Sequence, residues 1–231
     1  MTDETLDPRD AFAGVDMWIF DLDNTLYPYP PGLWAQIDGR MGAFISTLLT
    51  VDAIEARRVQ KEYFLRYGLT VRGLMKHHGV AAADFLSFVH DVDLSDIAPN
   101  PELGAAIEAL PGRKIIHTNS DRAHVARVLA RLDIAPGIFS AVHDIESTGF
   151  EPKPGPRAYD AVAQAEAIAP TRAAMFEDSA RNLLEPHKRG MRTILLPTTC
   201  DIASAGKDGA HVHFITHDLT GFLRRIMGET A

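Results

Sequence analysis

The chain contains two kinds of apolar segment: short continuous runs, and longer segments in which apolar residues recur with the period of a helix. The first run, Met17-Trp18-Ile19-Phe20, ends abruptly at Asp21. Such a run followed by a polar residue is typical of a buried strand that carries the polar group at its carboxyl end. Prolines and a glycine within residues 28–32 then indicate a rigid loop.

Residues 33–90 have a different pattern, with apolar side chains at the spacing of a helix. The apolar positions include Ile37, Met41, Phe44, Ile45, Leu48, Val59, Tyr63 and Leu65. Gly68 and Gly79 interrupt the pattern. We therefore expect an all-helical block, followed by a loop over residues 91–100 and a helix that begins at Pro101, a residue favoured at the first helical position.

After Pro101 the sequence alternates between helical and strand-like segments. Helices are predicted at residues 101–110, 122–132, 156–166, 180–189 and 219–227. Strands are predicted at residues 114–117, 141–142, 173–176, 193–196 and 211–215. This alternation predicts a parallel sheet with helices on both faces.

The predicted fold class is thus α/β, with a doubly wound parallel-sheet core and an inserted all-helical segment. The core takes residues 1–30 and 100–231, and the insertion takes residues 31–99. Ligands of such sheets bind beyond the carboxyl ends of the strands. We expect Asp21 to share that edge with residues 117–119 and 177–178.

Composition limits the classes of function. Hydrophobic residues make up 46% and charged residues 23% of the 231 residues, as in ordinary globular proteins, with disorder expected only within residues 1–10. A net charge of −8 without a dense Lys/Arg run argues against a nucleic-acid partner. No apolar stretch reaches the ~18 residues that span a bilayer, and the start lacks a signal peptide, so no membrane partner is expected.

Cys200 is the single cysteine, so an internal disulfide is excluded and a cytoplasmic location is expected. We assign Cys200 no role. His211 and His213 fall on one face of a predicted strand, an arrangement that a metal site could use. Without nearby cysteines or acids, a surface or edge strand is the favoured interpretation.

Two strand ends carry the first chemical candidates. Asp21 and Asp23 stand two residues apart, which alone fits a turn or capping cluster equally well. Thr118 and Asn119 end the next strand, where a hydroxyl group and a helix start can bind phosphate oxygens. Capping of the following helix by Asn119, Ser120 or Asp121 is compatible with that role.

Two further strand ends complete the set. Lys153 lies between prolines, so its ammonium group could neutralise a phosphate or a nucleophile, although an isolated lysine is usually a solvated surface residue. Glu177 and Asp178 form a hard-oxygen site suited to Mg²⁺, or else cap the next helix. Two adjacent acids repel, so a cation is expected beside them. Asn182 is placed to brace this site.

The ordered motifs D-x-D-x-T, T-N, K-P and E-D-S-x-x-N resemble those of the haloacid dehalogenase superfamily. The helical insertion resembles the C1 cap of that superfamily. The resemblance implies that Asp21 attacks phosphorus to form an aspartyl-phosphate. It implies that Asp23 protonates the leaving oxygen and then activates water. In that superfamily dehalogenases lack an acid at this second position, so the resemblance implies a phosphatase or phosphomutase.

The same resemblance implies the remaining roles. Thr118 and backbone N–H groups hold the phosphoryl oxygens, and Lys153 stabilises Asp21 and the developing charge. Mg²⁺ is bound by Asp178, Asp21 and the main-chain carbonyl of Asp23, with Glu177 as a weaker ligand candidate. Burial and a neighbouring carboxylate are expected to raise the pKa of Asp23, as a general acid requires.

Residues 21–28, 62–74 and 88–93 resemble pyrimidine 5′-nucleotidases, which implies a nucleoside 5′-monophosphate as substrate. Thr118, Asn119 and Lys153 are then the expected phosphate-binding residues. The expected base-binding residues are the possible stacking rings Tyr27, Tyr63 and Tyr67 and the possible hydrogen-bonding groups Arg72, His77, His78 and Asp91. Tyrosines in a helix–helix core and histidines at an exposed helix end are the alternatives.

The expected protein is therefore a Mg²⁺-dependent enzyme, a monomer or homodimer, that acts on a small-molecule phosphate monoester. Three alternatives stay open. The substrate could be a sugar phosphate or phosphoglycolate. The reaction could be that of a phosphomutase. A non-catalytic phosphate-binding protein is the third, although such a protein is expected to have lost Asp21, Asp23, Lys153 or Asp178, and all four are present.

Overall fold

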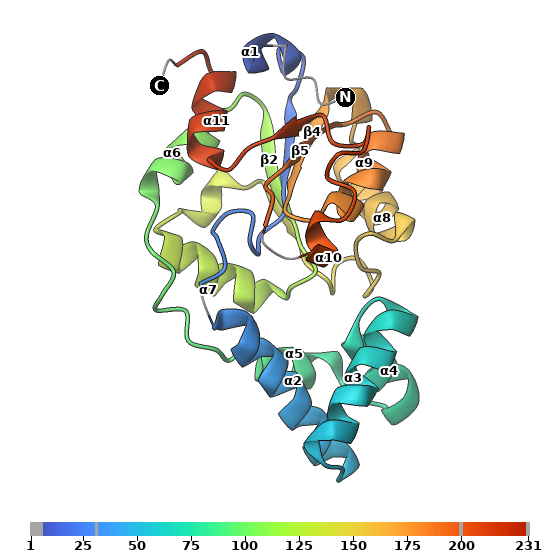
Figure 1. The fold of residues 1–231 in the computed structure, drawn as a ribbon. Coiled ribbons are helices and arrows are strands. Elements are labelled where there is room, and N and C mark those ends of the chain that lie inside the picture. Colours follow the sequence, from blue (N-terminus) through green and yellow to red (C-terminus); the bar gives the residue numbers. More distant parts are fainter. Residues whose placement is uncertain (1–6, 31, 199–200, 230–231) are drawn as a thin grey trace. The chain divides into compact units, whose positions relative to one another are not determined.

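The computed structural model describes residues 7–30, 32–198 and 201–229. Cys200 lies outside the described residues. The chain divides into an α/β unit, Met1–Pro28 with Ala98–Ala231, and a helical unit, Tyr29–Ile97 (Figure 1).

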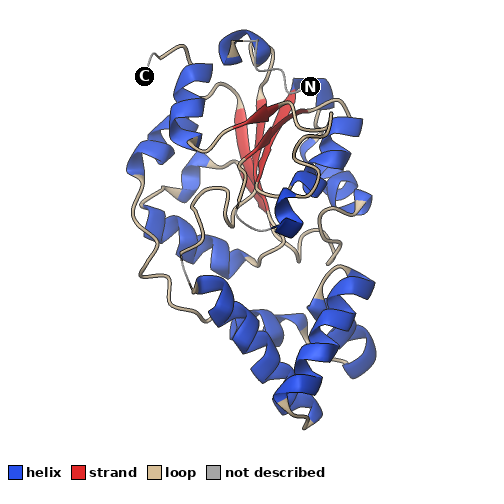
Figure 2. Cartoon of the chain, viewed as in Figure 1, coloured by secondary structure: helices blue, strands red, loops and turns tan. Residues whose placement is uncertain are grey.

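The α/β unit is built on a six-stranded parallel sheet with the strand order β3-β2-β1-β4-β5-β6 (Figure 2). The strands are β1 (Met17–Phe20), β2 (Arg113–His117), β3 (Ala141–His143), β4 (Ala173–Glu177), β5 (Arg192–Leu195) and β6 (Phe214–Ile215). This topology confirms the predicted parallel α/β sheet. Phe20 pairs with Ile116 and with Phe176, so Asp21 comes level with His117 and Glu177 at one edge.

Helices cover both faces of this sheet (Figures 1 and 2). They are α1 (Pro8–Ala11), α6 (Pro101–Ala109), α7 (Arg122–Leu132), α8 (Pro156–Glu166), α9 (Leu184–Lys188), α10 (Asp201–Ser204) and α11 (Leu219–Ile226). Short 3-10 helices occur at Pro136–Ile138, Pro170–Arg172 and Ala180–Leu183. Pro101 occupies the first turn of α6, as predicted, and the side chain of Asn100 caps that helix.

The central strand β1 supplies core residues to both faces, because side chains alternate along a strand. Met17 and Ile19 belong to one apolar cluster with Val162 of α8. On the opposite face, the Phe20 ring stacks on Phe176 with their centroids 4.8 Å apart. Burial on both faces fixes β1 and therefore the start of the loop at Asp21.

Two segments differ from the sequence prediction. The helix predicted over residues 180–189 begins as a 3-10 helix and becomes α9 at Leu184. Pro186 has no N–H to donate to the carbonyl of Asn182, which instead accepts the Tyr159 hydroxyl at 2.6 Å. The strand predicted from His211 starts only at Phe214, because a turn places the Val212 N–H on the Gly209 carbonyl at 3.0 Å.

The helical unit contains α2 (Leu33–Leu49), α3 (Ala53–Tyr67), α4 (Thr70–His78) and α5 (Ala82–Val89). Gly68 and Gly79 end α3 and α4 in left-handed conformations, with φ of 78° and 65°. Helices α3 and α4 approach closely at Gly73, where an added Cβ atom would lie 2.2 Å from Tyr63 Cγ. Among the described residues, no helix combines the length and apolarity that crossing a membrane requires.

Candidate active site

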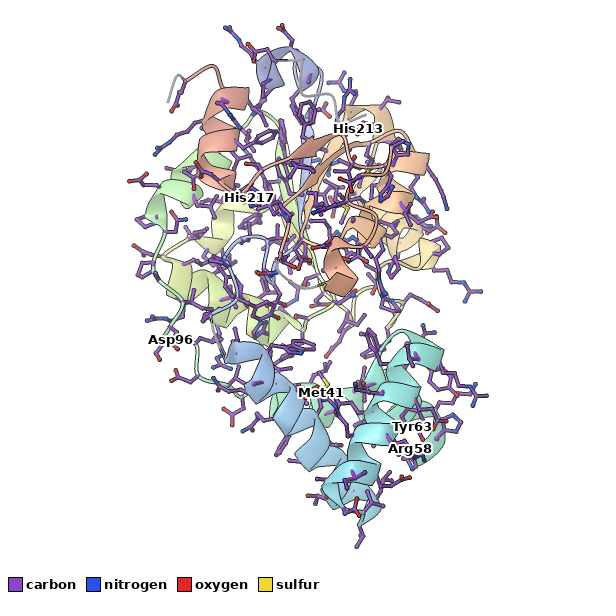
Figure 3. All side chains as sticks on the ribbon, viewed as in Figure 1. Met41, Arg58, Tyr63, Asp96, His213 and His217 are labelled. Carbon is purple, nitrogen blue, oxygen red and sulfur yellow. The ribbon has the colours of Figure 1, made fainter. Side chains whose placement is uncertain are left out.

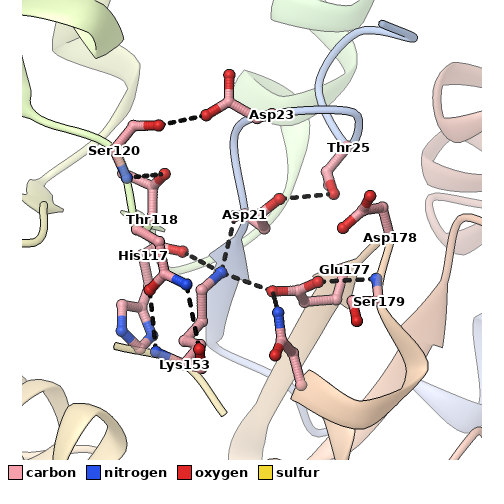
Figure 4. Close-up of polar contacts among 12 residues, drawn as sticks. Asp21, Asp23, Thr25, His117, Thr118, Ser120, Lys153, Glu177, Asp178 and Ser179 are labelled. Carbon is pink, nitrogen blue, oxygen red and sulfur yellow. Dashed lines mark hydrogen bonds and ion pairs between the residues drawn. The ribbon is translucent and has the colours of Figure 1, made fainter. Parts of the chain in front are cut away.

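Asp21 occupies the first position beyond β1, and its carboxylate is buried. Its main-chain N–H donates to the Phe176 carbonyl at 3.0 Å, which continues the ladder with β4. Its Oδ1 accepts a hydrogen bond from Lys153 Nζ at 2.7 Å, and its Oδ2 accepts one from Thr25 Oγ1 at 3.0 Å (Figure 4). Both oxygens of the carboxylate are therefore oriented.

Lys153 is buried rather than solvated, with its side chain only 1% exposed. Its ammonium donates to Asp21 Oδ1 at 2.7 Å, to Glu177 Oε1 at 2.6 Å and to the His117 carbonyl at 2.8 Å (Figure 4). Burial lowers the pKa of Lys153, but the charges of Asp21 and Glu177 outweigh burial and raise it above its ordinary value. The ammonium group is therefore charged and held between the ends of three strands.

The side chain of Asn119 contacts the main chain of the lysine loop. Its Nδ2 donates to the Lys153 carbonyl at 3.1 Å, and its Oδ1 accepts from the Lys153 N–H at 2.9 Å. Asn119 was predicted to bind phosphate. This geometry gives its side chain another task, which is to join the end of β2 to the loop that carries Lys153.

Glu177 is fully buried, and both of its oxygens accept hydrogen bonds from the protein. Its Oε1 accepts from Lys153 and from Asn182 Nδ2 at 2.8 Å, and its Oε2 accepts from the Ser179 N–H at 3.0 Å. Asn182 braces the site, as predicted. These contacts indicate that Glu177 fixes Lys153.

Asp178 lies beside this network and is half-buried. Its Oδ2 accepts a hydrogen bond from Asn24 Nδ2 at 2.9 Å. The backbone of Asn24 has a left-handed conformation, with φ 64°, which asparagine tolerates better than most residues. Ligand oxygens of Asp21, Glu177 and Asp178 all lie within 4.8 Å of one another.

This carboxylate group carries more negative charge than Lys153 can balance. Burial, together with the charges of Glu177 and Asp21, raises the pKa of Asp178 to about 9. Burial likewise raises the pKa of Asp21 to about 7, against the opposing effect of Lys153. Clustered carboxylate oxygens with this excess charge fit a hard divalent cation such as Mg²⁺.

Asp23 turns toward different neighbours. Its Oδ1 accepts from Tyr27 OH at 2.6 Å and from His124 Nε2 at 2.9 Å. Its Oδ2 accepts from Ser120 Oγ at 2.5 Å (Figure 4). Burial raises the pKa of Asp23, but the charge of His124 and the hydrogen bonds from His124, Ser120 and Tyr27 outweigh burial and lower it below its ordinary value. The predicted rise is therefore wrong, because donors rather than another carboxylate surround this group.

Thr118 is buried at the end of β2. Its Oγ1 accepts from the Ser120 N–H at 3.1 Å, and its own N–H donates to the His143 carbonyl at 2.9 Å. Of the three predicted caps of α7, Asp121 is the one used, since its Oδ1 accepts the His124 N–H at 2.8 Å.

The haloacid dehalogenase-like hydrolase family matches residues 15–184 of the chain. The chain belongs to this family. The match includes the first strand, the helical unit and every strand-end residue described above. The family to which the chain belongs is thus one of hydrolases.

Relatives of this haloacid dehalogenase-like hydrolase include Phosphate metabolism protein 8 of Saccharomyces cerevisiae, which is 26% identical over 195 residues. That match covers 78% of this chain but 60% of the yeast protein, so the chain spans less than two thirds of that relative.

Two solved structures share the fold. CbbY from Rhodobacter sphaeroides, in complex with phosphate, superposes with a TM-score of 0.59 at 18% identity and covers 89% of this chain and 95% of its own. The L-2-haloacid dehalogenase of Xanthobacter autotrophicus superposes with a TM-score of 0.57 at 15% identity and covers 94% of this chain and 100% of its own. At these identities the likeness shows the fold alone.

The helical unit of this haloacid dehalogenase-like hydrolase gathers several predicted base-binding residues on α3 and α4. Tyr63 OH lies 2.7 Å from His78 Nε2, and Tyr67 OH lies 2.5 Å from His77 Nε2 (Figure 3 labels Tyr63). Arg72 Nη1 donates to the Tyr67 carbonyl at 3.3 Å.

Two predicted base-binding residues lie outside this tyrosine–histidine cluster. Asp91 forms an ion pair with Arg40 at 2.9 Å. Tyr27 belongs to the α/β unit, where it is buried with its hydroxyl group on Asp23, so its ring is not an exposed stacking surface. The tyrosine–histidine cluster remains a predicted binding surface, and Tyr27 is better described as a support of Asp23.

Sequence reasoning missed His124 and considered Ser120 only as a helix cap. A signal existed for His124, since a polar ring stands one turn beyond the cap Asp121 among the buried residues of α7.

His213, one of the two histidines considered as a metal pair, accepts a hydrogen bond from the Thr193 N–H at 3.1 Å through Nδ1. In the part of the chain that the structure describes, only Asp21, Glu177 and Asp178 gather as three potential metal ligands.

Proposed function

We propose that this enzyme is a Mg²⁺-dependent phosphomonoester hydrolase that works through an aspartyl-phosphate on Asp21. One observation carries the proposal. The buried carboxylate of Asp21 contacts the Lys153 ammonium at 2.7 Å and has a carboxylate oxygen of Asp178 within 4.8 Å. A carboxylate attacks an anionic phosphate only when its charge and that of the phosphate are screened, and this arrangement provides for such screening.

The proposed first step forms a bond between an Asp21 oxygen and phosphorus and breaks the bond from phosphorus to the ester oxygen. Thr25 and Lys153 orient the attacking carboxylate. Asp23 transfers a proton to the departing oxygen, which leaves as an alcohol. Because Asp23 is ionised in the substrate-free protein, we infer that the incoming phosphate dianion raises its pKa and lets it take up that proton.

The second step returns the enzyme to its starting state. Asp23, now ionised, accepts a proton from water, and the water oxygen bonds to phosphorus. The bond from phosphorus to Asp21 then breaks and releases inorganic phosphate. Lys153 would balance the charge of the regenerated carboxylate, with Glu177 Oε1 accepting from its Nζ at 2.6 Å.

Asp21, Asp178 and the main-chain carbonyl of Asp23 are the groups that we propose would hold Mg²⁺. The bound ion would neutralise negative charge on the transferring phosphoryl group and on Asp21. Glu177 is assigned to the support of Lys153, because Lys153, Asn182 and Ser179 occupy its two oxygens.

For the substrate we propose a nucleoside 5′-monophosphate, with a pyrimidine base preferred. The helical unit would act as a C1-type cap that takes part in substrate recognition. Its contribution to recognition would be the cluster of Tyr63, Tyr67, His77 and His78, where paired rings and imidazoles offer both stacking and hydrogen bonding.

Release of inorganic phosphate from a panel of esters tests this function. The panel contains UMP, CMP, purine nucleotides, sugar phosphates and phosphoglycolate, each with Mg²⁺ or with a chelator. We expect turnover only with Mg²⁺, and none in Asp21→Asn, which should stay folded. Turnover that is unchanged in Asp21→Asn would remove Asp21 from the mechanism. Sugar phosphates that outperform UMP and CMP by a wide margin would refute the nucleotide preference, and isomerisation without phosphate release would indicate a mutase.

A further inference from the structure

We propose that His124 is a positioning residue that, together with Ser120, holds the acid/base carboxylate of Asp23 in its working orientation. This inference rests on the proposed phosphatase function. It adds a task for α7, since the fold otherwise uses that helix to cover the sheet.

The first observation is that the His124 ring is fixed independently of Asp23. His124 lies in the first turn of α7, and its N–H donates to the capping carboxylate of Asp121 at 2.8 Å. Its side chain is 0% exposed. The main chain that carries the ring is therefore held in place, and the buried ring has little room to rotate. Its Nε2 lies 2.9 Å from Asp23 Oδ1.

The second observation is that the donors to Asp23 come from two separate parts of the chain. Tyr27 lies on the same loop as Asp23 and is bridged to it through the main chain, so it follows any movement of that loop. Ser120 and His124 follow β2, at sequence distances of 97 and 101 residues from Asp23. These two donors therefore fix Asp23 relative to Thr118, the proposed phosphate contact.

The third observation is that the two oxygens of Asp23 have different partners. Oδ1 accepts from His124, and Oδ2 accepts from Ser120 at 2.5 Å. Donors on both oxygens restrict the tilt of the carboxylate plane as well as its position. Acid/base catalysis requires the carboxyl oxygen within hydrogen-bond reach of the leaving oxygen and later of water, so this restriction bears directly on rate.

A packing role alone would not require an imidazole here. The buried face of α7 is otherwise apolar, formed by Val125, Val128, Leu129 and Leu132. An apolar side chain at position 124 could fill the same space, but it would remove a donor from a buried carboxylate. The hydrogen bond between His124 Nε2 and Asp23 Oδ1 is therefore what distinguishes a positioning role from a packing role.

The test compares two substrates that differ in their need for a proton. A nucleotide releases an alcohol oxygen that must be protonated, whereas p-nitrophenyl phosphate releases a stable phenolate. In His124→Phe we expect kcat/KM for UMP to fall roughly 10- to 100-fold, which is part of the ~10²–10⁴-fold contribution of general acid catalysis, because Asp23 itself remains. We expect kcat/KM for p-nitrophenyl phosphate to fall much less.

Hydrolysis of the aspartyl-phosphate also needs Asp23, so p-nitrophenyl phosphate should show a burst of phenolate followed by slow turnover in His124→Phe. His124→Gln keeps an amide donor near the position of Nε2, and we expect it to recover a substantial part of the UMP activity. Val128→Ala is the matched control, because Val128 is buried on the same helix, and its effect should be equal for both substrates.

The outcomes are distinguishable. If the wild-type enzyme hydrolyses neither these two esters nor any ester of the panel above, the proposed function fails. If the wild type is active and both His124 variants lose the two substrates in equal proportion, or lose neither, the positioning role is wrong. Should His124→Phe fail to fold, the ratio of the two kcat/KM values in His124→Gln decides, since imperfect donor geometry should still reduce kcat/KM for UMP more than that for p-nitrophenyl phosphate.

Discussion

The side-chain amide of Asn119 holds the main chain of Lys153 from both sides, with one hydrogen bond donated at 3.1 Å and one accepted at 2.9 Å. The lysine ammonium in turn reaches Asp21 and Glu177. Asn119, at the end of β2, thus sets the position of the cation that faces the proposed nucleophile. Its side chain does so through the main chain of Lys153.

Replacement of Asn119 should accordingly act through Lys153. In Asn119→Ala both hydrogen bonds are lost, and we expect the free energy of unfolding to fall by about 1–3 kcal/mol. We expect kcat to fall more than KM changes, because the lysine rather than the substrate is displaced. Chemical denaturation and steady-state kinetics measure the two effects. Asn119→Asp, which keeps the accepting oxygen, is the comparison, and a change in KM alone would show that Asn119 instead contacts substrate.

Removal of the lysine charge should destabilise the fold as well as abolish turnover. Lys153→Met leaves two buried carboxylates without their cation, which we expect to cost about 3–5 kcal/mol of unfolding free energy. In the double variant Lys153→Met with Asp21→Asn, one of those charges is absent. The double variant should therefore be more stable than the sum of the single changes predicts. Strict additivity in urea denaturation would contradict this coupling.

Glu177 and Asp178 are adjacent but should differ in their response to substitution. Asp178→Asn removes a charged ligand oxygen, so we expect weak Mg²⁺ binding by calorimetry. Glu177→Gln should retain Mg²⁺ binding and instead weaken the hold on Lys153, because the Glu177 oxygens accept from Lys153, Asn182 and Ser179. Equal loss of Mg²⁺ affinity in both variants would make Glu177 a ligand.

The sequence predicted the frame of this site well, for physical reasons that can be named. A short apolar run that ends in Asp21 is typical of a buried strand with a polar end, and β1 spans the predicted residues Met17–Phe20. Parallel strands finish at one edge, so residues far apart in sequence could be assigned to one place. Glycines that accept positive φ marked the ends of α3 and α4 at Gly68 and Gly79.

Side-chain partners could not be predicted in the same way. The pKa of Asp23 depends on which way its carboxylate turns, and its donors Ser120 and His124 lie 97 and 101 residues further along the chain. Local pattern carries no information about that choice. The same holds for Asn119, whose amide could have faced a phosphate or the lysine loop, and for Tyr27, whose burial follows from its bond to Asp23.

The stability of the metal-free protein should depend on pH through Asp21 and Asp178. The pKa of Asp21 is raised from 3.8 to about 7 and that of Asp178 to about 9 when no cation is bound. At a pH between the unfolded and folded values, the folded protein holds protons that the unfolded chain has lost, so stability falls as pH rises. The metal-free protein should therefore lose stability progressively from about pH 4 to about pH 9 through these two groups.

Mg²⁺ binds ionised carboxylates, so it must displace those protons, and its affinity should rise with pH over the same window. The increase in Tm on adding Mg²⁺ should be larger at pH 8 than at pH 6, and calorimetry in buffers of different ionisation enthalpy should detect proton release. Asp178→Asn is the control in which the Mg²⁺-induced shift should largely vanish. A shift that is equal at both pH values would show that Asp21 and Asp178 are already ionised without the metal.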